Sequence, residues 1–190
     1  NLSVSFDTPA GELHAVRDVS FSLKSGEVLA IVGESGCGKS TLLSIIAGLL
    51  APETGTIVVN NPDGSLHYPR VGYMLQHDHL FEWRTIYQNV TLGLEIHHAL
   101  TKERTDYVKQ LLSDYGLESF QDKRPSELSS GMKQRAALIR TLVLEPELLL
   151  LDEPFSALDY QTRLQVGDDI GQIIGNEGKS ALLVTHDLSE

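Results

Sequence analysis

The chain has 190 residues, of which 41% are hydrophobic and 22% charged, a balance typical of a globular domain and not of a disordered tail. This length allows one well-buried domain, with room for a small inserted subdomain. Acidic residues outnumber basic ones by 26 to 15, which gives a net charge of -11. Such a surface repels phosphate backbones and anionic lipid, so direct binding to nucleic acid or to a lipid surface is disfavoured.

The cysteine count and the hydropathy indicate the redox compartment and the kind of membrane attachment to expect. The single cysteine, Cys37, cannot form an internal disulfide, which fits a reducing compartment. The longest mostly apolar run, over 42–51, is about half of what a membrane span needs, so any membrane attachment is expected to go through a protein partner. The sequence starts at Asn1 without a methionine and stops at Glu190 directly after a polar motif, so we expect it to be a piece of a longer chain.

The first half of the chain alternates strands with turns. Apolar residues with a period of two predict half-buried strands in the first 25 residues, at Leu2, Val4 and Phe6 and again at Val19, Phe21 and Leu23. A short apolar strand over 28–32 is followed by a glycine-rich turn and by an apolar helix over 39–50 that Pro52 ends. Further strands are expected over 56–60 and 71–76.

Helical spacing dominates the stretch 85–116, where Val108, Leu111 and Leu112 share one face after a cap at Thr101. A second helix is expected over 132–144, and a buried strand over 148–151 follows it. A helix over 162–174 and a buried strand over 181–184 complete the pattern. Strands that alternate with helices in this way predict a parallel sheet covered on both faces.

The strongest local signal is the run from Gly33 to Ser40, which fits the pattern G-x-x-x-x-G-K-[ST] between a predicted strand and a predicted helix. Glycines let the backbone N–H groups converge on phosphate oxygens, and the helix N-terminus adds its partial positive charge. Lys39 is expected to reach the β- and γ-phosphates, and Ser40 to ligate Mg²⁺. The predicted nucleotide-binding residues of this loop are Gly33, Glu34, Ser35, Gly36, Cys37, Gly38, Lys39, Ser40 and Thr41.

Two adjacent carboxylates, Asp152 and Glu153, follow the buried strand over 148–151. Because a parallel sheet presents its ligand site at the carboxyl ends of its strands, we expect both acids to lie beside the phosphate loop. Asp152 suits Mg²⁺, and Glu153 suits polarising the water that attacks the γ-phosphate. The alternative is that the two acids only end a strand and cap the next helix.

The run from Leu128 to Arg135 lies about twenty residues before the acidic pair. A serine hydroxyl and a glycine N–H at a helix start make another anion site, although an ordinary helix cap at Ser129 or Ser130 would give the same letters. This run resembles the signature sequence of ABC transporter ATPases, in which it completes the ATP pocket of the opposing subunit. Ser129, Ser130 and Gly131 would then bind nucleotide, with Ser130 in place of the family's usual first glycine.

Further matches to the same family occur in the family's order. Gln76 resembles the Q-loop glutamine, which senses Mg²⁺ and the γ-phosphate. The run from Ser156 to Asp159 resembles the D-loop at the dimer interface, and His186 resembles the switch histidine on the γ-phosphate. Phe6 stands where the family places an aromatic ring that stacks on adenine, although it could instead share the core with Leu2 and Val4. The resemblance thus implies Glu153, His186, Lys39 and Gln76 as catalytic residues and Ser40, Gln76 and Asp152 as Mg²⁺ ligands.

The resemblance implies an α/β fold: a phosphate-loop NTPase (RecA-like) core with an N-terminal antiparallel β subdomain and an inserted α-helical subdomain. Residues 1–81 and 136–190 would form the core with the β subdomain, and residues 82–135 the helical subdomain that ends in the signature. Since the family usually continues well past the switch histidine, a C-terminal part is expected to be missing from this chain. The cofactors implied are ATP and Mg²⁺.

The segments 71–76 and 83–95 and the run from Gly131 to Arg135 are similar to importer subunits for nitrate, taurine and alkanesulfonates. That similarity implies a subunit at the cytoplasmic face of the inner membrane that hydrolyses ATP to drive solute uptake. Its partners would be a second copy of itself, transmembrane permease subunits and, indirectly, a solute-binding protein, with no nucleic acid. The alternatives are a soluble ABC-type ATPase with a non-transport target, another phosphate-loop enzyme, and a nucleotide-dependent module that does not hydrolyse ATP.

Overall fold

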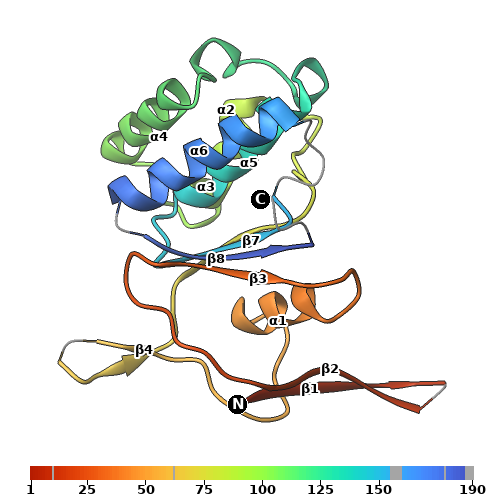
Figure 1. The fold of residues 1–190 in the computed structure, drawn as a ribbon. Helices are drawn as coiled ribbons and strands as arrows, with labels where there is room; N and C mark the ends of the chain where they lie inside the picture. Colours follow the sequence, from red (N-terminus) through yellow and green to blue (C-terminus); the bar gives the residue numbers. More distant parts are fainter. Residues whose placement is uncertain (10, 62, 155–159, 178, 187–190) are drawn as a thin grey trace.

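The computed structural model describes residues 1–190 except 10, 62, 155–159, 178 and 187–190 (Figure 1). Its centre is a four-stranded sheet in the order β3-β8-β7-β6, with every neighbouring pair parallel. The strands are β3 (Val28–Val32), β6 (Val71–Met74), β7 (Leu148–Asp152) and β8 (Ser180–Thr185). The expected parallel α/β core is therefore confirmed, and its carboxyl ends all meet at one edge.

Helices cover both faces of this sheet, as Figure 1 shows. Helix α1 (Lys39–Ile46) lies on one face, and α5 (Ser130–Leu142) and α6 (Tyr160–Glu177) lie on the other. Because successive side chains of a strand point to opposite faces, Leu150 packs in the core on the α1 side, while Leu149 and Leu151 pack in the core on the α5 side. The continuous leucine run of β7 is thus explained by burial on both faces.

Helix α1 is shorter than the expected helix over 39–50. Gly48 adopts a left-handed backbone (φ 72°) soon after Ile46, so the helix ends well before Pro52. The hydroxyl of Tyr68 donates to the carbonyl oxygens of Ile45 and Ile46 at the helix end, where carbonyl groups run out of partners within the helix.

An antiparallel hairpin of β1 (Leu2–Thr8) and β2 (Gly11–Val19) lies beyond α1. The prediction of a strand from the alternation of Val19, Phe21 and Leu23 is wrong. Leu2 at the start of β1 already pairs with Val19, so nothing remains in β1 for residues 20–24 to pair with, and Phe21 is exposed. The strand expected over 56–60 is reduced to β4 (Val59–Asn60), which pairs with an unpredicted short strand, β5 (Leu66–His67).

The middle of the chain is helical, as predicted, and lies on the α5 side of the sheet. It contains α2 (Ile86–Val90), α3 (Leu92–Ile96), α4 (Lys102–Asp114) and the single-turn 3₁₀ helices Glu118–Phe120 and Pro125–Glu127. The Thr101 side chain accepts a hydrogen bond from the Arg104 N–H, which confirms the predicted cap of α4. Helix α5 runs unbroken through position 135, where the resemblance implies the end of the helical subdomain.

Within the described residues, no helix is both long enough and apolar enough to cross a bilayer.

Glu147, the residue before β7, contacts His67 and Arg70 from an earlier part of the chain. Its carboxylate accepts hydrogen bonds from the backbone N–H of Arg70 (3.0 Å) and from the Arg70 guanidinium (3.3 Å), and His67 Nε2 lies 3.0 Å away. The Arg70 backbone bond first, and the His67 bond second, lower the pKa of Glu147 from 4.5 to about 2. The carboxylate thus joins β5 and the start of β6 to the residue that precedes β7.

This lowered pKa predicts an acid-dependent contribution to stability. A group with a depressed pKa in the folded state stabilises the fold above its unfolded pKa, and the contribution is lost as the pH falls from about 4.5 toward about 2. We expect Glu147→Gln to lower the free energy of unfolding at pH 7 by a modest amount, because the carboxylate is partly solvent-exposed. Urea unfolding at pH 7 and pH 3.5 should show a smaller deficit at the lower pH; an equal deficit would contradict this origin.

Candidate active site

The loop between β3 and α1 is built by glycines at left-handed backbone positions. Gly36 (φ 81°) and Gly38 (φ 99°) turn the chain so that α1 starts at Lys39. A side chain at Gly38 would also collide with the Ala15 carbonyl oxygen of β2. Glycine is therefore required here both for backbone conformation and for the close approach of the hairpin.

Lys39 is buried inside this loop. Its ammonium group donates to the carbonyl oxygens of Gly33 (2.6 Å) and Glu34 (2.8 Å), and the residue is 7% exposed. A buried cation that is held by neutral carbonyls has no compensating negative charge in these bonds, so an anion that enters the loop gains a strong electrostatic interaction.

The end of β7 meets the start of α1. Asp152 is 5% exposed, and its Oδ1 accepts a hydrogen bond from Ser40 Oγ at 3.1 Å. Its Oδ2 accepts one from the hydroxyl of Tyr73 on β6 at 3.2 Å. Burial, and then the charge of Asp152, raise the pKa of Tyr73 to about 12, so the phenol remains protonated as the donor. The predicted approach of the acidic pair to the phosphate loop is thus present, with an added tyrosine that the sequence pattern did not indicate.

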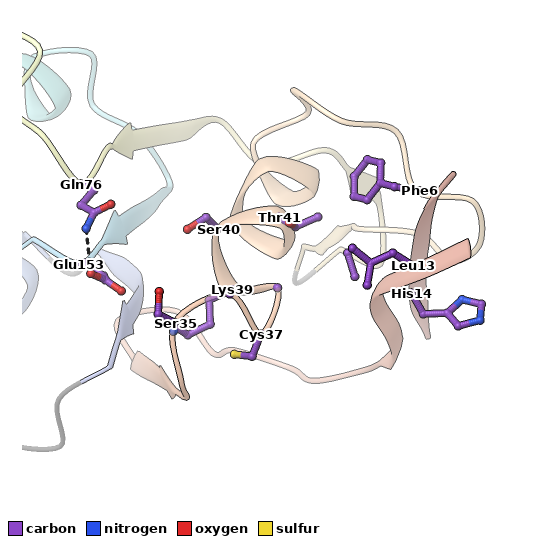
Figure 2. Close-up of a pocket in the computed structure, with 13 residues that line it drawn as sticks. Phe6, Leu13, His14, Ser35, Cys37, Lys39, Ser40, Thr41, Gln76 and Glu153 are labelled. Atoms are coloured by element: carbon purple, nitrogen blue, oxygen red, sulfur yellow. Dashed lines mark hydrogen bonds between the residues drawn. The ribbon is translucent and has the colours of Figure 1, made fainter. Parts of the chain in front are cut away.

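Side chains that follow both neighbouring strands contact the Glu153 carboxylate. Gln76, after β6, donates through Nε2 to Glu153 Oε2 at 3.0 Å, a bond that Figure 2 shows. His186, after β8, places Nδ1 3.3 Å from the same oxygen. Two predicted residues therefore meet at one carboxylate oxygen of a third, and the three follow three adjacent strands, as expected at the carboxyl edge of a parallel sheet. Glu153 itself has a left-handed backbone (φ 46°), which a non-glycine residue adopts at a cost.

The phosphate loop, Gln76 and Glu153 open onto a cavity of about 390 Å³ that extends to the β1–β2 hairpin, whereas Asp152 and His186 are not part of its lining. In Figure 2, Phe6 and Leu13 project from the hairpin toward the loop and α1. Leu2 and Val4 of the same strand are buried, whereas Phe6 is 40% exposed, so Phe6 belongs to the cavity and not to the core. The predicted residues that line the cavity are Phe6, Ser35, Gly36, Cys37, Gly38, Lys39, Ser40, Thr41, Gln76 and Glu153.

Other predicted residues lie elsewhere. The described lining of the cavity does not include Ser129, Ser130 or Gly131, which lie at the start of α5. Ser129 is the cap of that helix, and its hydroxyl accepts a hydrogen bond from the Met132 N–H at 3.4 Å. Asp159 lies outside the described residues.

The oxygens around Ser40 suit a hard divalent cation. Mg²⁺ is usually bound by one or two carboxylates together with water and substrate phosphates, and the Ser40 hydroxyl and Asp152 carboxylate supply such oxygens. In the described part of the chain, no group of three or more His, Cys, Asp or Glu side chains is placed to hold a metal by itself. The donors therefore fit Mg²⁺ that arrives with a nucleotide.

Comparison with known proteins agrees with this geometry. A model of the ABC transporter family matches residues 16–156. The chain belongs to this family. It is 48% identical over 176 residues to the uncharacterized ABC transporter ATP-binding protein YtlC of Bacillus subtilis, covering 93% of this chain and 68% of that protein.

A second relative and a solved structure extend the comparison. The chain is 41% identical over 191 residues to the taurine import ATP-binding protein TauB of Pelagibacter ubique, covering all of this chain and 72% of that protein. The fold superposes with a TM-score of 0.83 and 28% identity on the dimeric ATP-binding cassette MJ0796 in a post-hydrolysis state bound to ADP and Pi, over all of this chain and 87% of that one. The expected fold, a phosphate-loop NTPase core of the ABC type, is thus confirmed.

One contact in this ABC ATPase domain was not visible in the sequence. Arg140, in the last turn of α5, donates to the backbone carbonyl oxygens of Asp78 (2.7 Å) and His79 (2.8 Å), shortly after Gln76. His79 also has a left-handed backbone (φ 44°). The helix that starts at the signature run therefore holds the segment that follows Gln76. From the sequence, Arg140 is only a charged residue of a predicted helix. Its hydrogen-bond partners are backbone atoms about sixty positions away, which no local pattern reveals.

We expect Arg140→Met to lower the free energy of unfolding by about 1.5–3 kcal/mol, since it removes charged hydrogen bonds to partly buried carbonyls. Hydrogen exchange should become faster at residues 77–80. Arg104→Met is the matched control, because Arg104 forms an ion pair with Glu145 whose partners are both partly exposed, and such pairs contribute at most about 1 kcal/mol. Equal effects of the two substitutions, or unchanged exchange at 77–80, would contradict a role for Arg140 in holding this segment.

Proposed function

We propose that the chain is the ATP-hydrolysing subunit of an ABC importer. The observation that carries the proposal is the contact between Ser40, next to Lys39 in the phosphate loop, and Asp152 at the end of β7. This contact brings the phosphate-binding loop, the oxygens that suit Mg²⁺ and the Glu153 carboxylate together at one edge of the sheet.

ATP binding begins with an exchange of partners at Lys39. Its ammonium group leaves the Gly33 and Glu34 carbonyls and binds the β- and γ-phosphates, while the N–H groups at the start of α1 receive phosphate oxygens. Ser40, Asp152 and Gln76 would hold Mg²⁺, which neutralises charge on the phosphates when bound. The base stacks on Phe6 beside Leu13, in the part of the cavity that lies against the hairpin.

Hydrolysis uses the groups that meet at Glu153. The carboxylate orients a water molecule for in-line attack on the γ-phosphate and accepts its proton. Gln76 must first release the Glu153 oxygen that it now holds, and His186 turns from the same oxygen to the γ-phosphate. Entry of the nucleotide thus frees the catalytic carboxylate.

A second copy of the chain would complete the site. Ser129, Ser130 and Gly131 lie outside this cavity at a helix start, where they could meet a phosphate held by the opposing subunit. Ser130 is the first residue of α5 and is absent from the residues with positive φ, so a serine is accommodated here without backbone strain. Asp159 is assigned to the interface between the copies by the resemblance of its run to the D-loop.

Transport requires partners outside this chain. Relatives named for taurine import support a subunit that binds permease subunits at the cytoplasmic face of the inner membrane and, through them, responds to a solute-binding protein. The solute would be a small sulfonate or a similar anion such as nitrate. Closure of two copies on ATP and their opening after hydrolysis would be the two-state movement that drives the permease.

The test is Glu153→Gln. We expect ATP hydrolysis to fall by about 10²–10⁴-fold, because the general base is lost, while ATP binding persists and an ATP-bound dimer accumulates. Phosphate release and light scattering measure the two effects.

Glu82→Gln is the control, because Glu82 is an exposed acid outside the cavity whose nearest cation, Lys133 Nζ, is 4.0 Å away. Hydrolysis by Glu153→Gln at the wild-type rate would remove Glu153 from the mechanism. Failure of the wild-type protein to bind ATP would overturn the proposed function itself.

A further inference from the structure

The two oxygens of the Asp152 carboxylate have different partners. Oδ1 accepts from Ser40 Oγ on α1, and Oδ2 accepts from the Tyr73 hydroxyl on β6. The side-chain torsion that rotates a carboxylate has a broad range of favourable angles. A single hydrogen bond to one oxygen would therefore still allow the carboxylate plane to rotate. With donors on both oxygens, and with 5% of the residue exposed, the plane of the carboxylate is held in one orientation.

Tyr73 reaches Asp152 because of the sheet register. Tyr73 pairs with Leu150 on β7, so Asp152 lies two residues further along the neighbouring strand and on the same face. The Tyr73 ring packs in the core on the α1 side, which fixes the direction of the phenol. Ser44 Oγ, which lies one turn after Ser40 on α1, donates to the Ser40 carbonyl oxygen.

We propose that Tyr73 is a positioning residue for the Mg²⁺ site: its hydroxyl holds Asp152 Oδ2 so that Oδ1 faces the position beside Ser40 Oγ. This inference rests on the proposed function. When Ser40 turns to a cation, the cation would replace the Ser40 hydroxyl at Oδ1 while the Tyr73 hydroxyl still holds Oδ2, so both oxygens of the carboxylate would keep a partner. Partners that orient a metal ligand in this way contribute about 10–100-fold to metal affinity or activity in other proteins.

Substitution by phenylalanine separates this role from packing. Tyr73→Phe keeps the ring in the core and removes only the hydroxyl that binds Asp152. Tyr68→Phe is the matched control. The Tyr68 hydroxyl also forms hydrogen bonds beside α1, but it donates to the Ile45 and Ile46 carbonyls at the end of that helix remote from Ser40. A loss that arises from helix packing would follow both substitutions, and a loss of carboxylate orientation would follow only the first.

The experiment measures Mn²⁺ binding to the ATP-bound protein by electron paramagnetic resonance, with ATP binding in EDTA measured separately. We expect Tyr73→Phe to weaken Mn²⁺ binding about tenfold, with metal-free ATP binding unchanged, and Tyr68→Phe to leave both unchanged. The Mg²⁺ concentration for half-maximal hydrolysis should rise for Tyr73→Phe, and the maximal rate should recover at high Mg²⁺.

Three results would overturn the inference. Unchanged Mn²⁺ affinity in Tyr73→Phe would show that the hydroxyl does not position Asp152. Parallel losses of Mn²⁺ binding and metal-free ATP binding would show that the hydroxyl serves the fold alone. Wild-type protein that binds no Mn²⁺ in the presence of ATP would contradict the proposed function as well, and that outcome is distinct from a defect confined to the variant.

Discussion

The hydrogen bond from Ser40 Oγ to Asp152 Oδ1 joins two parts of the chain that are 112 positions apart. Ser40 follows β3 and Asp152 ends β7, and β8 lies between these strands in the sheet. The bond can form only because all four strands are parallel, so that every carboxyl end lies at the same edge. The same constraint brings Gln76 and His186 to Glu153.

Without nucleotide, the charged groups of the site bind one another or the backbone. Lys39 donates hydrogen bonds to two carbonyl oxygens, and Asp152 accepts hydrogen bonds from two hydroxyls. Glu153 contacts the side chains of Gln76 and His186. In the proposed mechanism, contacts with the nucleotide and its cation would replace these contacts with stronger, charge-assisted ones. In this mechanism, nucleotide binding would therefore change the contacts of the loop, Gln76 and His186 together. Since Arg140 connects residues 78 and 79 to α5, the helix that begins at the signature run would take part in this proposed change.

Local patterns predicted the parts of the structure that depend on neighbouring residues. The glycine loop before Lys39, the buried leucine run of β7 and the Thr101 cap are each encoded within a few positions. Features that depend on register were missed. The alternation around Phe21 satisfies a strand pattern, but β1 has no residues left to pair with it. Tyr73 and Leu13 join the site only through the pairing of β6 with β7 and of β1 with β2, which no short motif records. At Phe6 the structure argues against the core alternative, because the residue is 40% exposed and lines the cavity, while stacking on adenine stays a prediction.

The most direct test of the account is a crystal structure of the protein with Mg²⁺ and a non-hydrolysable ATP analogue. We predict that Lys39 Nζ leaves the Gly33 and Glu34 carbonyls for the β- and γ-phosphates, and that the cation separates Ser40 Oγ from Asp152 Oδ1. The base should lie against Phe6. A nucleotide bound elsewhere, with Lys39 still on its own loop and the acidic pair remote from the metal, would contradict the account.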